Sequence, residues 1–141
     1  MSLIQWKSEY DTNLVEINHQ HLEMMHILNE LNIKYINGYK DEELVIILNK
    51  LSNYALTHFT TEERFFDKYN YPNADSHREE HQYFIRKIEF YADDLKNGKR
   101  DFFEDMLNFL TSWLNDHLLN VDKKYIEYFK EIKANIKVEL E

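Results

Sequence analysis

The residues best suited to chemistry in this chain are two pairs of side chains in its middle third. His58 and Glu62 stand four residues apart, and so do His77 and His81. Four residues make about one turn of an α-helix, so each pair is predicted to project from one helical face. Imidazole nitrogens and a carboxylate oxygen in this pattern are typical ligands of a transition-metal ion.

Both pairs can face the same interior. The intervening residues 71–73, with the sequence Tyr-Pro-Asn, read as a short loop, and helices joined by a short loop pack antiparallel. Three buried imidazoles and a carboxylate would be costly to desolvate without a partner, and a metal ion supplies one. The alternative is a set of hydrogen-bonded core histidines and a surface His–Glu contact. Two such pairs inside apolar stripes favour the metal site.

Composition indicates a single all-α domain. The 141 residues include only 2 Gly and 1 Pro, which favours long helices with short connections. With 0 Cys, neither a disulfide nor a thiolate metal site is available. The chain has 17 Lys and Arg against 26 Asp and Glu, a net charge of −9, which argues against nucleic acid as a partner.

The sequence also carries no membrane signal. The N-terminal residues MSLIQWKSEY lack the apolar core of a signal peptide. No run approaches the ~18 apolar residues that a membrane-spanning helix needs. The expectation is therefore a cytoplasmic protein without a membrane partner.

The first helix is predicted to position a further histidine. Asn18 is predicted to cap it and Gly38 to end it, with His21 on its apolar stripe. His19 lies about 200° and His26 about 140° around the helix from His21, so both are predicted to be exposed and not to bind metal.

Three more helices are predicted. The second opens at Asp41 and runs to the loop at 71–73. The third begins between positions 73 and 76, with Ser76 and Glu79 as a capping box, and ends near Asn97-Gly98. The fourth carries Trp113, Leu114 and His117 on its apolar face.

The predicted fold class is all-α, an antiparallel up-down four-helix bundle with an N-terminal arm and a C-terminal helical segment. One domain spans 1–141, with the arm at about 1–17, the bundle at about 18–120 and the C-terminal segment at about 121–141. The lysine-rich residues 123–141 fit either a terminal helix packed on the bundle or a dimer-forming helix.

The end of the fourth helix poses a geometric problem. His117 and Asp122 are five residues apart, which is a rotation of about 140° on a regular α-helix. Both can face inward only if the helix loosens or ends near Asn120.

Taken in order, the motifs resemble those of the hemerythrin family, in particular the single-domain bacterial hemerythrins (bacteriohemerythrins). Each motif alone is weak, but four in sequence with family-like separations, from Trp6 to the end of the fourth helix, are specific. They are Gln20-His21, His58-Phe59-x-x-Glu62-Glu63, His77-x-x-x-His81 and Trp113-Leu114-x-x-His117-x-x-x-x-Asp122.

The resemblance implies a non-heme diiron centre with an oxo or hydroxo bridge between two irons per chain. One iron would be bound by His77, His81 and His117, and the other by His21 and His58. Glu62 and Asp122 would bridge them. If both irons are six-coordinate, the second keeps one open position, where dioxygen would bind. Trp113, Leu114 and Leu118 resemble the apolar lining of the oxygen pocket.

By the same resemblance the chain would bind dioxygen reversibly, for oxygen storage, transport or delivery to an oxygen-consuming enzyme, and would not itself be an enzyme. The alternative is a diiron enzyme or a sensor that handles peroxide, nitric oxide or iron. Carboxylate-rich diiron enzymes use two Glu-x-x-His motifs. The motif here, Glu23 to His26, points away from His21, which disfavours that class. The oligomeric state stays open.

Overall fold

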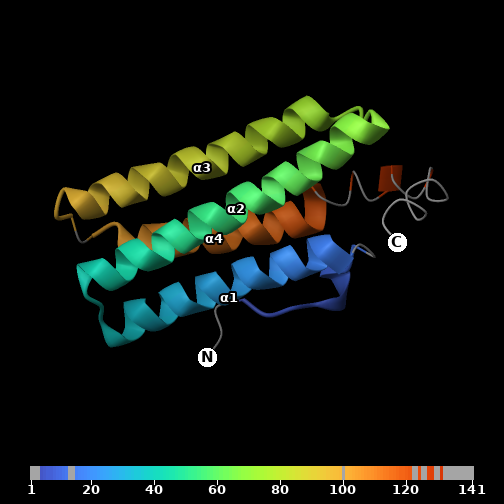
Figure 1. Ribbon diagram of the computed structural model, residues 1–141. Coiled ribbons are helices and arrows are strands. Elements are labelled where there is room, and N and C mark those ends of the chain that lie inside the picture. The colour runs from blue at the N-terminus through green and yellow to red at the C-terminus, as the bar shows by residue number, and fades with distance from the viewer. Residues whose placement is uncertain are drawn as a thin grey trace.

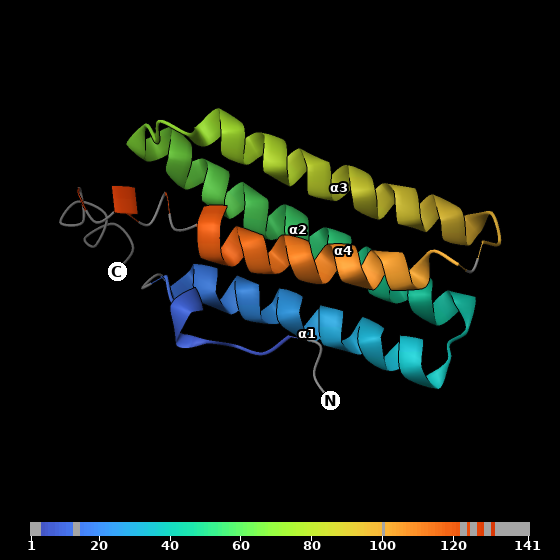
Figure 2. The same cartoon turned by 180° about the vertical axis from the view of Figure 1, so that it is seen from behind.

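In the computed structural model, four long helices form an antiparallel up-down bundle (Figures 1 and 2). The structure describes residues 4–12, 15–99 and 101–121, together with positions 124, 127, 128 and 131. Along the chain the elements are η1 (Ser8–Tyr10), α1 (Val15–Asn37), α2 (Asp41–Tyr69), α3 (Ala74–Lys96), α4 (Phe103–Asp116) and the π-helical turn η2 (His117–Val121). The predicted fold class is confirmed.

The helices end where the sequence supplies the appropriate residues. Gly38 takes a φ of 89° directly after α1, and its N–H donates to the carbonyl of Lys34 at 2.9 Å. The backbone N–H of Lys40 donates to the Glu43 carboxylate at 2.9 Å, which satisfies an otherwise orphan donor at the start of α2. Asn70, with a φ of 54°, ends α2 in the left-handed conformation that Asn tolerates. The connections between these helices are short, as the scarcity of Gly and Pro predicts.

Two predicted caps are wrong. Ser76 lies inside α3, which begins at Ala74 and is preceded by Asn73. Asn18 lies inside α1, which already includes Val15. A polar residue near each helix start fits a cap by type, but residue type alone does not fix where the first turn begins.

Asn18 instead holds the N-terminal arm. Its Oδ1 accepts hydrogen bonds from the Thr12 N–H at 3.0 Å and the Thr12 hydroxyl at 2.8 Å, and its Nδ2 donates to Asp11 at 2.8 Å. Further along the arm, the Tyr10 hydroxyl donates to Asn115 on α4 at 2.8 Å. The arm therefore joins the start of α1 to the end of α4.

The core runs the length of the bundle between the four helices. Each helix contributes apolar side chains at helical spacing, and the most deeply buried of them include Leu28, Leu51, Phe84 and Leu110. Helix α2 packs against α1 and α3, and α1 also packs against α4. The Phe84 and Trp113 rings, 4.3 Å apart between centroids, join α3 to α4. These contacts fix the rotation of each helix and hence the direction of its histidines.

Within the described residues, no helix is long and apolar enough to cross a membrane. The predicted C-terminal segment at 121–141 and its two alternatives lie almost wholly outside the described residues. Tyr128 ties this region back to the bundle, because its hydroxyl donates to the backbone carbonyl of Tyr69 at the end of α2 and its ring lies 5.5 Å from that of Tyr71 between centroids.

Candidate metal centre

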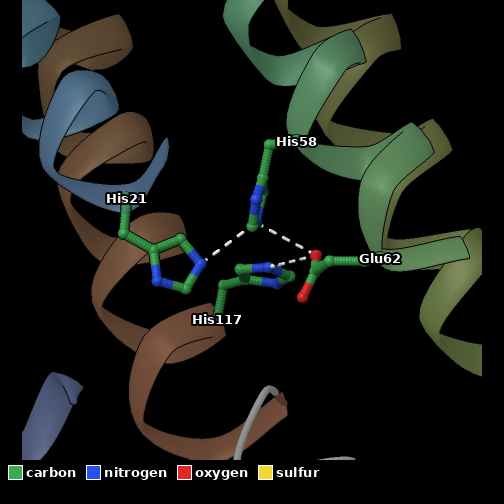
Figure 3. A group of neighbouring side chains, drawn as sticks. All are labelled: His21, His58, Glu62 and His117. Atoms are coloured by element: carbon green, nitrogen blue, oxygen red, sulfur yellow. Dashed lines mark hydrogen bonds and ion pairs between the residues drawn. The ribbon is translucent and has the colours of Figure 1, made fainter. Parts of the chain in front are cut away.

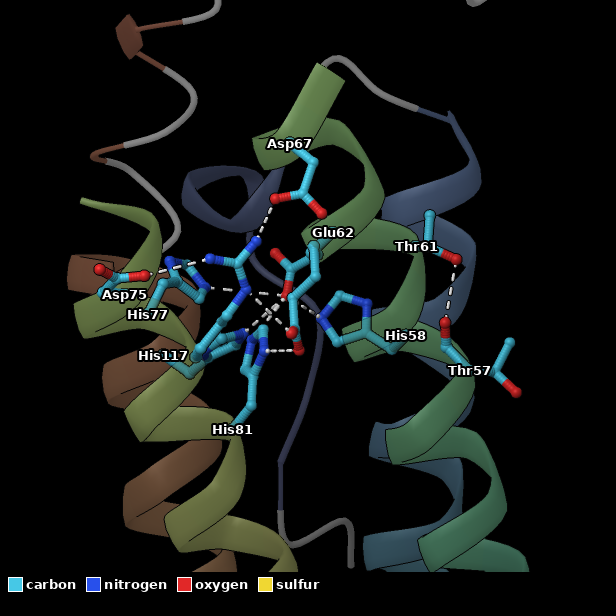
Figure 4. Close-up of polar contacts among 11 residues, drawn as sticks. Thr57, His58, Thr61, Glu62, Asp67, Asp75, His77, His81 and His117 are labelled. Carbon is cyan, nitrogen blue, oxygen red and sulfur yellow. Dashed lines mark hydrogen bonds and ion pairs between the residues drawn. The ribbon is translucent and has the colours of Figure 1, made fainter. Parts of the chain in front are cut away.

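Five histidines and one glutamate meet inside one end of the bundle, near the loop that joins α2 to α3 (His21 in Figure 3, the others in Figure 4). Their placement follows from helical phase, because each lies on the apolar face of its own element. All are between 0% and 3% exposed. They are His21 from α1, His58 and Glu62 from α2, His77 and His81 from α3, and His117 at the start of η2.

Glu62 lies at the centre of this cluster. Its Oε1 is 3.0 Å from Nε2 of His58, 3.2 Å from Nε2 of His81, 3.4 Å from Nε2 of His117 and 3.8 Å from Nε2 of His77. The same carboxylate oxygen thus faces histidines from three elements. Its other oxygen, Oε2, is buried and accepts no hydrogen bond from the described residues.

Two histidine nitrogens also approach each other directly. Nε2 of His21 and Nε2 of His58 are 3.0 Å apart (Figure 3). Two nitrogen ligands that bind one metal ion at about 2.1 Å and at right angles are about 3.0 Å apart. The separation therefore fits two ligands of one ion.

The electrostatics of the cluster match ligands rather than surface groups. Burial alone raises the pKa of Glu62. In the metal-free protein, the charge of His58 and the polar contacts of His117, His58 and His77 with the carboxylate outweigh it and hold that pKa well below the usual range. Burial lowers the pKa of His81, against the raising influence of Glu62. An ionised carboxylate and a neutral imidazole are the forms that bind metal.

The donors form two overlapping groups, each able to hold one metal ion. The atoms within a group lie within 4.8 Å of one another. One group is His21, His58, Glu62 and His117, and the other is Glu62, His77, His81 and His117. Nitrogen and oxygen donors without sulfur suit iron, and the free Oε2 of Glu62 gives a second ion an anionic ligand. The residues therefore fit a metal pair.

The chain changes its helical winding at His117. The π-helical turn η2 runs from His117 to Val121, directly after α4 ends at Asp116. A π-helix has i→i+5 hydrogen bonds, so residues five apart come close to one face. This is the loosening that the His117–Asp122 spacing requires. Asp122 itself lies outside the described residues, and its role as a ligand stays a prediction.

The family model described as "Hemerythrin HHE cation binding domain" matches residues 12–129 of this chain. The chain belongs to the hemerythrin family. The predicted resemblance is confirmed at that level.

Individual relatives agree with this assignment. A bacteriohemerythrin of Clostridium acetobutylicum is 28% identical over 128 residues, covering 86% of this chain and 98% of that protein. A bacteriohemerythrin of Pseudomonas aeruginosa is 25% identical over 127 residues, covering 90% of this chain and 82% of that protein. A solved structure of wild-type hemerythrin superposes with a TM-score of 0.80 at 26% identity, covering 88% of this chain and 95% of that one.

Apolar side chains pack against the cluster. Trp113, Leu114 and Leu118, the predicted lining of the oxygen pocket, are all buried in the main core. The Trp113 ring stacks on His117 with centroids 4.6 Å apart and an interplanar angle of 12°. On the other side, Phe59 stacks on His81 at 3.9 Å and 10°. These rings restrict how the two imidazoles can turn.

His19 and His26 are exposed and lie in neither donor group, as the helical phase predicts. The prediction that α1 contributes only His21 to the cluster therefore agrees with the geometry of the described residues.

The sequence reasoning missed the residues that orient the histidines from outside. The sequence motifs include Gln20 and Glu63 without indicating a role for them, and they specify neither Thr61 nor Arg78. In the structure Gln20 contacts His58, and Glu63 contacts His81. The sequence does contain a signal for the Glu63–Arg78 pair. These two residues have opposite charges, and they directly follow the predicted ligands Glu62 and His77 along the chain.

Proposed function

We propose that this hemerythrin-family chain binds dioxygen reversibly at a pair of iron ions. The ions would be held by His21, His58, Glu62, His77, His81, His117 and Asp122, with an oxo or hydroxo bridge between them. The observation that carries the proposal is the convergence of two donor groups on one buried carboxylate, Glu62. When bound, the two ferrous ions supply the electrons that dioxygen binding requires.

The chain's own residues have three tasks in this function. First, Glu62 holds a negative charge between the two donor groups, which offsets the charge of the ions in a dry interior. Second, His81 and His117 keep their ring orientations through stacking on Phe59 and Trp113. Third, the buried side chains of Leu114 and Leu118 exclude water, which limits proton entry and favours release of dioxygen over its further reduction.

The same geometry disfavours a carboxylate-rich diiron enzyme. That class places two Glu-x-x-His motifs in the bundle interior. Here the motif from Glu23 to His26 carries its histidine on the exposed face of α1. We therefore propose oxygen storage, transport or delivery to an oxygen-consuming enzyme in the cytoplasm as the role of the chain.

Iron reconstitution tests the proposal. Metal-free protein is loaded anaerobically with ferrous iron, desalted and assayed for metal and protein. Two irons per chain are expected for the natural sequence. Glu62→Gln should lose both, because Glu62 belongs to both donor groups. The matched control Glu79→Gln removes the same charge from an exposed position on α3 and should keep two. One iron per chain, or unchanged loading in Glu62→Gln, would contradict the proposal.

A further inference from the structure

Two histidines of the cluster have chemically different partners on the side away from it. Nδ1 of His81 is 2.9 Å from Oε2 of Glu63, which is a carboxylate. Nδ1 of His58 is 2.9 Å from Oε1 of Gln20, which is a neutral amide. In each ring the Nδ1–H donates outward, so in the neutral imidazole Nε2 is the nitrogen that presents its lone pair toward the cluster.

Glu63 is held in place by Arg78. Nε of Arg78 is 3.3 Å from Oε1 of Glu63, while Oε2 of the same carboxylate faces His81. Arg78 is itself fixed by Asp67 and by Asp75, the latter at 3.2 Å from its Nη1 (Figure 4). The acceptor of the His81 N–H is therefore a carboxylate with both oxygens engaged.

Gln20 is fixed by a chain of neutral groups. The Thr61 hydroxyl donates to the carbonyl of Thr57 at 2.9 Å, so its oxygen accepts from Nε2 of Gln20 at 3.1 Å. This orients the amide with Oε1 toward His58. Gln20 and Thr61 are both buried, and neither brings a formal charge to His58.

We infer that Glu63 makes the metal position beside His81 the stronger of the two, so that this position fills first. A carboxylate that accepts the outer N–H of a histidine ligand raises the basicity of the other nitrogen. Hydrogen bonds to an ionised acceptor are roughly twice as strong as neutral ones. Gln20 gives His58 the same orientation without this effect. The inference rests on the metal pair proposed above.

Stepwise metal binding tests whether the position beside His81 fills first. Metal-free protein is titrated with Co(II), followed by visible absorption and calorimetry. The natural sequence should bind two ions in two resolved steps. Glu63→Gln should weaken the tighter step by roughly 10- to 100-fold, the usual effect of removing an outer partner of a ligand. The weaker step should keep its affinity. Two equal steps in the natural sequence would overturn the inference.

A matched control separates the hydrogen bond from general charge. Glu79→Gln makes the same charge change on an exposed side chain of α3 that belongs neither to the ion pairs of Arg78 nor to the contacts of His81. It should leave both steps unchanged. A loss equal to that of Glu63→Gln would show that the long-range field, and not the contact with His81, sets the order.

A reciprocal variant predicts a gain, which a merely structural role cannot produce. Gln20→Glu gives His58 a carboxylate acceptor and should tighten the weaker step. If Glu63→Gln does not fold, Arg78→Gln loosens Glu63 and should weaken the tighter step by a smaller factor. The inference would be overturned if Gln20→Glu changed only the tighter step, or if Arg78→Gln changed only the weaker step. Absence of any Co(II) binding in the natural sequence would instead contradict the proposed function.

Discussion

Replacing Leu114 by alanine tests whether the apolar side chains packed against the cluster control the chemistry of the centre. Leu114 is 1% exposed and lies one turn before His117 on α4. Removing its branched end should cost about 2–5 kcal/mol of unfolding free energy, because the packed core around it relaxes only partly. For a chain of this length that is a fall in Tm of about 3 °C per kcal/mol. No predicted ligand changes, so iron loading should stay at two per chain.

Leu114→Ala should also change how the centre reacts with oxygen and with azide. The space left by Leu114→Ala admits water beside the centre, and water there can donate a proton and promote irreversible oxidation. The half-life of the oxygenated protein in air should therefore shorten, and azide should bind faster to the oxidised protein. Both are measured by visible absorption, on samples with confirmed iron content.

Leu110→Ala is the matched control. Leu110 is 0% exposed, belongs to the same core and lies one turn further from His117 on the same helix. It should lose a similar stability while keeping the half-life and azide rate of the natural sequence. Equal rates in the natural sequence and Leu114→Ala would refute the reasoning, as would an equal acceleration in Leu110→Ala.

Three further outcomes follow from the described contacts. His19→Gln and His26→Gln should each keep two irons per chain, because both side chains are exposed; iron analysis would detect the loss that refutes this. Tyr10→Phe should cost about 0.5–1.5 kcal/mol in urea unfolding by removing the bond to Asn115, and no loss would mean that this contact is not formed. In the metal-free protein, the lowered pKa of Glu62 adds stability at neutral pH that is lost as pH falls below 4.5. Glu62→Gln should therefore weaken the acid dependence of unfolding, and an unchanged dependence would contradict the ionised carboxylate.

Much of the centre could be predicted because helical phase depends on local sequence. Once His21, His58 and His117 are placed on apolar stripes, packing of those stripes brings them together without knowledge of the loops. The spacing of His117 and Asp122 even required an irregular turn, and η2 supplies one at that point.

The features that could not be predicted depend on contacts between elements. Asn18 lies within α1 rather than at its cap, and its side chain instead bonds the arm at Thr12. Similarly, the Gln20-His21 motif does not show that Gln20 supports His58, which lies on another helix. Such roles follow from the relative rotation of two helices, which single-sequence patterns do not specify.

Cycling of dioxygen over the reduced diiron protein tests the central claim most directly. Anaerobic ferrous protein is exposed to air, returned to an oxygen-free atmosphere and followed by visible absorption, with bound dioxygen counted per chain. The proposed function predicts one dioxygen per two irons and a charge-transfer band that appears and disappears over repeated cycles. A band that never forms, or rapid irreversible oxidation in the first exposure, would contradict it.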